Sequence, residues 1–219
     1  MTAGLVVLWR HARTAHNATG RLQGQIDIPL DEVGHWQART AARAMAVTVH
    51  PAVVVTSDLS RARTTAGYLA DLAGVVPVVD ERLRERSFGE WEGMTGEEIA
   101  PRWPAEFAAW RRGDDMRSTG AETRTEVARR TADAIREHAA ALAPVDTLVV
   151  VSHGAAITLA LTALLELSVD GWRGLVGLDN GHWARLRPAR ESSTPPWRLA
   201  GYNLGPHDTV EDWNAGSDI

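Results

Sequence analysis

The sequence predicts an α/β fold in three layers, α/β/α, with helices on both faces of a mostly parallel central sheet. Two observations predict it. Short apolar, β-branched runs alternate along the chain with segments in which apolar residues recur at helical spacing. In addition, 219 residues, of which 44% are hydrophobic, suffice for one sizeable core and are few for two. We therefore expect a single domain over residues 1–205, with residues 86–120 as a cap or insertion over the site and residues 206–219 as a polar C-terminal tail.

Each element follows from its local pattern. Strands are expected where runs are apolar and β-branched, at residues 5–9, 53–56, 75–79 and 148–151, with a final pair at 183–186 and 197–202. Helices are expected at residues 31–49, 122–142 and 154–167, where apolar residues are dense or helically spaced. Ser57 and Asp58 are candidate N-caps for a further helix that ends near residue 73.

Composition narrows the possible chemistry. All 23 basic residues are arginine, so Schiff-base catalysis and a P-loop lysine are excluded, and an anion must be held by arginine, histidine or a helix N-terminus. The chain has no cysteine, which excludes thiol nucleophiles and disulfides and makes a reducing cytoplasm the expected compartment.

The charge distribution bears on partners. The net charge is -5 and the arginines are scattered among acidic residues, so we expect no nucleic acid and no membrane partner, and instead a small phosphorylated metabolite. The apolar run at residues 5–9 is far shorter than a signal sequence or a membrane span.

Polar residues follow four of the expected strands directly or after a short interval. They are Arg10-His11, Arg61, Arg84-Glu85 and His153-Gly154. Sites in open α/β sheets form outside the carboxyl ends of the parallel strands, so these groups should converge at one edge. Each residue alone is more often structural or solvated than catalytic, but the combination matches one reaction.

That reaction is phosphoryl transfer to a side chain. Arginine compensates the charge on the transferred group, an imidazole nitrogen can attack phosphorus to form a phosphohistidine, and a carboxylic acid can protonate the departing oxygen. We expect His11 to be the nucleophile and Glu85 to be the acid.

These residues resemble the histidine phosphatase superfamily, in its phosphoglycerate mutase-like branch, over nearly the whole chain. Within that branch, the chain is similar to the actinobacterial phosphatases of glucosyl-3-phosphoglycerate. The matching segments are residues 10–14 with Asn17, residues 21–24, residues 57–66, residues 83–85 with 88–95, and residues 151–154.

The resemblance implies a phosphoglycerate mutase-like fold and a pocket in which His11 is phosphorylated and Glu85 acts as acid and then as base. The other catalytic residues it implies are Arg10, Arg61 and His153. The residues it implies for substrate and phosphate binding are Asn17, Gln23, Gly24, Gly154 and Ala155. It implies no cofactor. Relatives commonly form dimers, which makes a homodimer one expected state.

Two positions depart from the family pattern. Ala12 stands where the family has the glycine after the nucleophile, and Ala121 replaces the second glycine of a Gly-Gly-Glu motif. A methyl group at either position could crowd the phosphate or conflict with a positive φ.

Two other functions stay open at this point. A mutase of the same family would return the phosphoryl group to its substrate, although the chain lacks the longer central insertions of cofactor-dependent mutases. A catalytically idle phosphoryl-binding module is suggested by Ala12, but no catalytic group is missing.

The other candidate sites favour structural roles. We predict no metal, because the remaining histidines show no metal-ligand spacing, and we expect solvated or capping roles for them; they are His16, His35, His50, His138, His182 and His207. Asp114 and Asp115 are expected in a charged loop. Trp91, Trp103 and Trp110 are expected either to line a cap over the pocket or to pack in the core or on the surface.

Overall fold

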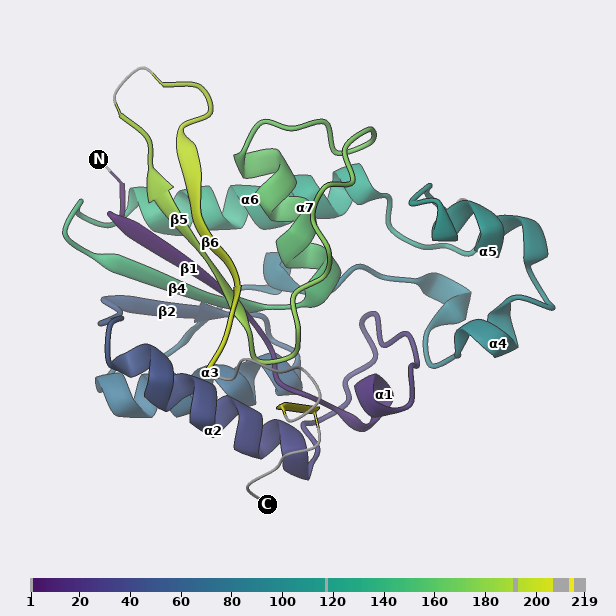
Figure 1. Ribbon diagram of the computed structural model, residues 1–219, viewed down its shortest axis with the longest axis horizontal. Coiled ribbons are helices and arrows are strands. Elements are labelled where there is room, and N and C mark those ends of the chain that lie inside the picture. The colour runs from purple at the N-terminus through teal and green to yellow at the C-terminus, as the bar shows by residue number, and fades with distance from the viewer. Residues whose placement is uncertain (1, 117, 191–192, 207–212, 215–219) are drawn as a thin grey trace.

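A computed structural model describes residues 2–116, 118–190, 193–206 and 213–214 (Figure 1). Its central sheet has the strand order β3-β2-β4-β1-β5-β6. Strands β1 (Leu5–Arg10), β2 (Val53–Thr56), β3 (Val78–Val79) and β4 (Thr147–Ser152) run parallel to one another. Strands β5 (Trp183–Pro188) and β6 (Trp197–Leu204) are antiparallel and extend the sheet beyond β1. The mostly parallel sheet predicted from the sequence is confirmed.

Helices cover both faces of this sheet, as Figure 1 shows. Val7 and Trp9 of β1 pack in one hydrophobic cluster with residues of α2 (Glu32–Ala46) and α3 (Ser60–Ala73). Val6 and Leu8 point to the opposite face and pack with residues of α6 (Arg124–Ala140) and α7 (Gly154–Leu164). Successive side chains of a strand alternate between faces, so the uninterrupted apolar run of β1 serves two cores at once.

Local capping explains most helix starts. Asp31 caps α2 by accepting a hydrogen bond from the backbone of Gly34, and Thr123 begins α6 with a capping box. The prediction that Ser57 or Asp58 caps α3 is wrong. The N-cap is Leu59, whose side chain has no acceptor, and the carboxylate of Asp58 is ion-paired with Arg84 instead.

Several other boundaries differ from the sequence prediction, and α2, for example, ends at Ala46 rather than near residue 49. The third strand is reduced to Val78–Val79 at the sheet edge, and α7 ends at Leu164 rather than near residue 167. The third strand is short because only Val78 and Val79 pair with β2.

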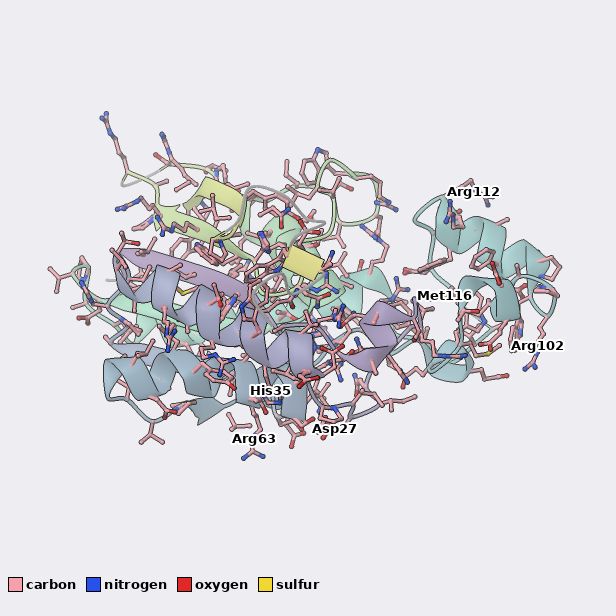
Figure 2. All side chains as sticks on the ribbon, turned by 60° about the horizontal axis from the view of Figure 1, so that its bottom comes forward. Asp27, His35, Arg63, Arg102, Arg112 and Met116 are labelled. Carbon is pink, nitrogen blue, oxygen red and sulfur yellow. The ribbon has the colours of Figure 1, made fainter. Side chains whose placement is uncertain are left out.

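Residues 86–120, called the cap segment below, extend away from the sheet. They contain η2 (Gly89–Trp91), α4 (Gly96–Ile99) and α5 (Pro104–Arg111), and the short helices α1 (Ala15–Ala18) and η1 (Glu81–Leu83) lie before them in the chain. The segment has its own small cluster, built around Trp91, Ile99 and Met116. Figure 2 shows Arg102 and Arg112 on the outer side of this segment and Met116 on the side toward the sheet.

The C-terminal range that was expected to be a polar tail contains a buried residue. Trp213 has no exposed surface and joins the cluster under α2 and α3, where its indole nitrogen donates to the carbonyl of Asn180 at 2.6 Å. In the described part of the chain, no helix combines the length and apolar character needed to cross a bilayer.

Candidate active site

The two predicted histidines meet at the carboxyl edge of the sheet. Strands β1 and β4 are neighbours in parallel register, with Arg10 opposite Ser152, so the residues that follow them emerge side by side. The backbone N–H of His11 donates to the carbonyl of Ser152 at 2.9 Å. The centroids of the His11 and His153 rings are 5.1 Å apart. Both side chains are buried, with 2% and 0% of their surface exposed.

Hydrogen bonds assign the tautomer of each neutral ring. Nδ1 of His11 lies 2.7 Å from the carbonyl oxygen of Ala12, an acceptor, so this nitrogen carries the proton and Nε2 keeps its lone pair. His153 is the reverse case. Its Nδ1 accepts from Nε of Arg61 at 3.2 Å, so its proton is on Nε2. One ring therefore offers a nucleophilic nitrogen and the other an N–H donor.

Burial and positive charge keep both rings neutral. The pKa of His11 is lowered well below 6.5, first by burial and then by the charges of Arg61 and Arg10. The pKa of His153 is lowered in the same way by burial, with Arg61 as the next cause. A neutral imidazole is the form that can attack phosphorus.

Two arginines supply positive charge beside the histidines. Arg61 lies in the first turn of α3, and its terminal nitrogens donate to the carbonyls of Ile26 and Gly24 at 2.8 and 2.7 Å. Burial lowers its pKa to about 10, which leaves it charged at neutral pH. Arg10 ends β1 and donates to the carbonyl of Leu178.

Glu85 lies across from these residues, at the N-terminus of α7. Its Oε1 accepts from the backbone N–H groups of Arg86 and Ala156 at 2.8 and 3.0 Å, and its Oε2 accepts from Ala155 at 3.1 Å. A carboxyl group has about four lone-pair positions, so one direction on Oε2 is left for a substrate atom or a proton.

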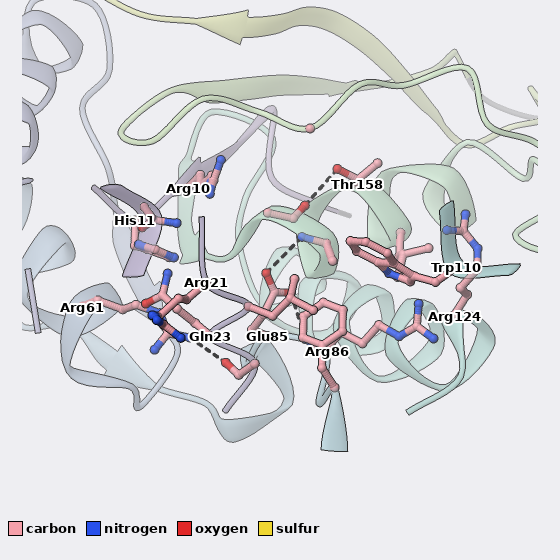
Figure 3. Close-up of a pocket in the computed structure, with 18 residues that line it drawn as sticks. Arg10, His11, Arg21, Gln23, Arg61, Glu85, Arg86, Trp110, Arg124 and Thr158 are labelled. Carbon is pink, nitrogen blue, oxygen red and sulfur yellow. Dashed lines mark hydrogen bonds between the residues drawn. The ribbon is translucent and has the colours of Figure 1, made fainter. Parts of the chain in front are cut away.

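The predicted residues surround one cavity of about 380 Å³ (Figure 3). Of the site residues expected from the sequence, those that line it are Arg10, His11, Asn17, Gln23, Gly24, Arg61, Glu85, Gly154 and Ala155. His153 lies directly behind, in contact with His11 and Arg61. Among the described residues, Nε of Arg10 and Nε2 of His153 are buried without a hydrogen-bond partner. Unpaired buried atoms also occur elsewhere in the described residues, but these two are donors beside the cavity, where a bound anion would give both of them a partner.

The substitution of glycine by Ala12 leaves the cavity open. Ala12 is buried in a small cluster with Leu30 and Ala38, and it does not line the cavity. In the described ranges, the non-glycine residues with positive φ are Glu166 and Asn203, so neither Ala12 nor Ala121 needs the conformation that favours glycine.

At the far end of the cavity, the sequence pointed to the cap segment and to Trp110 but not to the other residues that line it. Arg86, Phe88 and Trp110 of the cap segment line it together with Arg124, Thr158 and Leu159. Their sequence signals were weak, because Arg124 looks like an exposed helix residue and Thr158 is set apart only by its position one turn after Gly154. Of the three tryptophans considered for the cap, Trp110 lines the cavity, whereas Trp91 is fully buried in the cluster that Trp103 packs against.

The other histidines have separate surroundings. Nδ1 of His35 is bonded to Tyr68, and His138 pairs with Asp80 at 3.0 Å. His182 is buried against Trp213, which differs from the solvated or capping role expected for it. His207 lies outside the described residues. Within the described ranges, no group of three or more His, Cys, Asp or Glu residues could hold a metal ion.

Comparison with known proteins gives matches over nearly the whole chain. The family model of the histidine phosphatase superfamily (branch 1) matches residues 6–201. The glucosyl-3-phosphoglycerate phosphatase of Mycobacterium tuberculosis is 36% identical over 214 residues, which cover 93% of this chain and 96% of that protein. A solved structure of the mycobacterial glucosyl-3-phosphoglycerate phosphatase superposes with a TM-score of 0.83 at 36% identity, covering 92% and 99% of the two chains. A probable phosphoglycerate mutase of Yersinia pestis is 34% identical over 208 residues, or 90% of this chain and 89% of that protein.

Proposed function

Because this chain belongs to branch 1 of the histidine phosphatase superfamily and is a phosphatase enzyme, we propose that it hydrolyses a small phosphorylated metabolite through a phosphohistidine on His11. The observation that carries this proposal is the pair of opposite tautomers. Nε2 of His11 holds a lone pair, and the buried N–H of His153 stands beside it with the cations of Arg10 and Arg61.

The first step transfers the phosphoryl group to the protein. Nε2 of His11 attacks phosphorus while the bond from phosphorus to the ester oxygen breaks, and the phosphate oxygens are held by Arg10, Arg61 and His153. The unpaired Nε of Arg10 and Nε2 of His153 gain partners in this arrangement. The side-chain amide of Gln23, whose Oε1 accepts from Thr14, adds a further donor.

Glu85 accounts for the proton in both steps. As an acid it donates a proton to the departing alkoxide, and as a base it then takes one from the water that attacks the phosphohistidine. Phosphate leaves, and both His11 and Glu85 return to their starting forms. The three backbone N–H groups on the Glu85 carboxyl hold it in one orientation throughout.

For the substrate, we propose glucosyl-3-phosphoglycerate or another sugar phosphate. The support is the 36% identity to a relative that carries this activity in its name. The absence of cysteine supports a reducing compartment, and we place the reaction in the cytoplasm.

The test of the reaction uses a generic aryl phosphate in the presence of a chelator. Hydrolysis should persist, because Arg10 and Arg61 supply the positive charge, and His11→Ala should abolish it. An acid-labile, base-stable phosphoprotein should be trapped in the wild type and be absent from the variant. His50→Ala, a change at an exposed histidine, is the matched control. Normal turnover by His11→Ala would contradict the proposal.

A mutase is the second candidate, because the probable phosphoglycerate mutase of Yersinia pestis is 34% identical to this chain. The two functions are separated by incubating 3-phosphoglycerate with and without bisphosphoglycerate. Release of inorganic phosphate supports the phosphatase, and formation of 2-phosphoglycerate supports the mutase.

A further inference from the structure

The cavity has a second positively charged end beyond Glu85. Figure 3 shows His11, Arg10 and Arg61 at one end, Glu85 in the middle, and Trp110 and Arg124 at the other end. We propose that Arg124 is a second anion-binding residue, so that the preferred substrate is a phosphate ester whose alcohol part carries another carboxylate or phosphate. This inference rests on the proposed phosphatase function.

The distribution of ion pairs singles out Arg124. Of the five arginines that line the cavity, Arg21 is paired with Glu98 at 2.8 Å and Arg86 with Asp115 at 2.8 Å. Arg10, Arg61 and Arg124 form no ion pair with a carboxylate in the part of the chain that the structure describes. The first two are at the phosphate end. Arg124 is their counterpart at the far end.

The hydrogen bonds of Arg124 leave its outer nitrogens available. Nε donates to the carbonyl of Val169 at 3.2 Å, which fixes the plane of the guanidinium. Across the described ranges, no hydrogen bond is found for its two terminal nitrogens. A guanidinium held by Nε, with both terminal nitrogens free, can bind a carboxylate or phosphate with two parallel bonds.

The surrounding charge favours an anion at this end. Burial and then the charges of Arg173 and Arg86 lower the pKa of Arg124, and the carboxylates of Asp115 and Asp170 offset part of this effect. The carboxylate of Asp115 is already bonded to Arg86 and to the backbone N–H of Arg124. Arg86 and Arg124 both line the cavity here, and the Asp115 carboxylate pairs with Arg86, so the charge of Arg124 is left to attract an anion in a half-buried place, where charge interactions are stronger than in water.

The wall between the two ends fits a carbon skeleton. Phe88 and Leu159 are buried apart from their cavity faces, and Trp110 is partly exposed while its ring packs against Trp91 and Phe107. Glu85 is the acidic residue among those that line the cavity. An ester oxygen beside Glu85 would direct the alcohol along this wall toward Arg124.

A purely structural role for Arg124 predicts a different result. Its side chain donates from Nε to the carbonyl of Val169, which ties the start of α6 to a neighbouring loop, so loss of this contact would slow all substrates alike. A binding role slows only substrates that carry the second anion.

The test compares Arg124→Gln, Arg124→Lys and the control Arg129→Gln, an equal loss of charge at an exposed position on the same helix. Each is assayed with 4-nitrophenyl phosphate and with two matched pairs, 3-phosphoglycerate against glycerol 3-phosphate and glucose 1,6-bisphosphate against glucose 6-phosphate. The pairs differ in one anionic group, and they distinguish a carboxylate from a second phosphate.

The wild type should prefer the member with two anions in at least one pair. Arg124→Gln should lower kcat/KM for that member by about 10-fold to 100-fold, mainly through KM, as expected for a hydrogen bond to a charged group. Turnover of 4-nitrophenyl phosphate should stay within about twofold, Arg124→Lys should restore part of the preference, and Arg129→Gln should resemble the wild type.

The inference is overturned if the wild type shows no preference in either pair, or if Arg124→Gln slows both members of a pair equally. The proposed function fails separately, if the wild type hydrolyses none of these esters.

Discussion

Mild acid should destabilise this protein because His11 and His153 are buried as neutral rings. Their pKa values in the folded state lie well below 6.5, through burial and then the charge of Arg61, whereas in the unfolded chain both return to about 6.5. Below pH 6.5 the unfolded state therefore binds more protons than the folded state. Stability present above the unfolded pKa is lost as the pH falls toward the folded pKa.

The expected loss of stability follows from the titration of these two histidines. A histidine that is neutral when folded and protonated when unfolded costs about 1.4 kcal/mol per pH unit below its unfolded pKa. Two such rings give about 3 kcal/mol at about pH 5.5 relative to neutral pH. That is a large part of the roughly 5–15 kcal/mol typical of a folded domain. The assay is urea unfolding, followed by tryptophan fluorescence, at about pH 7.5, 6.5 and 5.5.

Substitutions of His153 and His11 test whether these two rings cause the loss of stability in mild acid. His153→Asn keeps an acceptor for Nε of Arg61 and removes one titrating group, so the loss between about pH 7.5 and 5.5 should fall by roughly half. Adding His11→Asn should remove most of the remainder. A double variant that loses as much stability as the wild type would refute the reasoning.

Three further outcomes are expected. Ala12→Gly should cost about 1.5–2 kcal/mol in urea unfolding, from a lost buried methyl group and added backbone freedom, with kcat/KM unchanged; a changed kcat/KM would mean that the methyl group does reach the substrate. Glu85→Gln should slow alkyl phosphates, which have poor leaving groups, by about 100-fold or more, and 4-nitrophenyl phosphate much less; equal slowing would remove its role as an acid. Trp213→Ala should lower the free energy of unfolding by about 3–5 kcal/mol, because the ring is fully buried; an unfolding midpoint like that of the wild type would show that this residue is not held in the core.

The sequence by itself determined the architecture and which residues gather at the proposed phosphate end of the cavity. Apolar periodicity located β1, β2 and β4, and a parallel sheet places their carboxyl ends together, so Arg10, His11 and His153 could be assigned to one edge before any contact was known. The spacing of the motif around residues 83–85 allowed Glu85 to be assigned to the same edge. These predictions rest on local patterns and on one rule of topology.

Only the tertiary structure decided the features that depend on distant contacts. The tautomers of His11 and His153 follow from partners that the folded chain brings to each ring nitrogen. Trp213 appears in a polar stretch, and nothing nearby in the sequence indicates that Asn180 and the helices α2 and α3 will enclose it.

Dependence on distant contacts also explains why the sequence did not indicate that Arg124 lines the cavity. A helix surface and a cavity wall have the same sequence pattern when the residue is an arginine, because its long side chain can lie against apolar groups and still reach solvent. Which of the two it becomes depends on the cap segment opposite, and that segment is placed by packing between parts of the chain far apart in sequence.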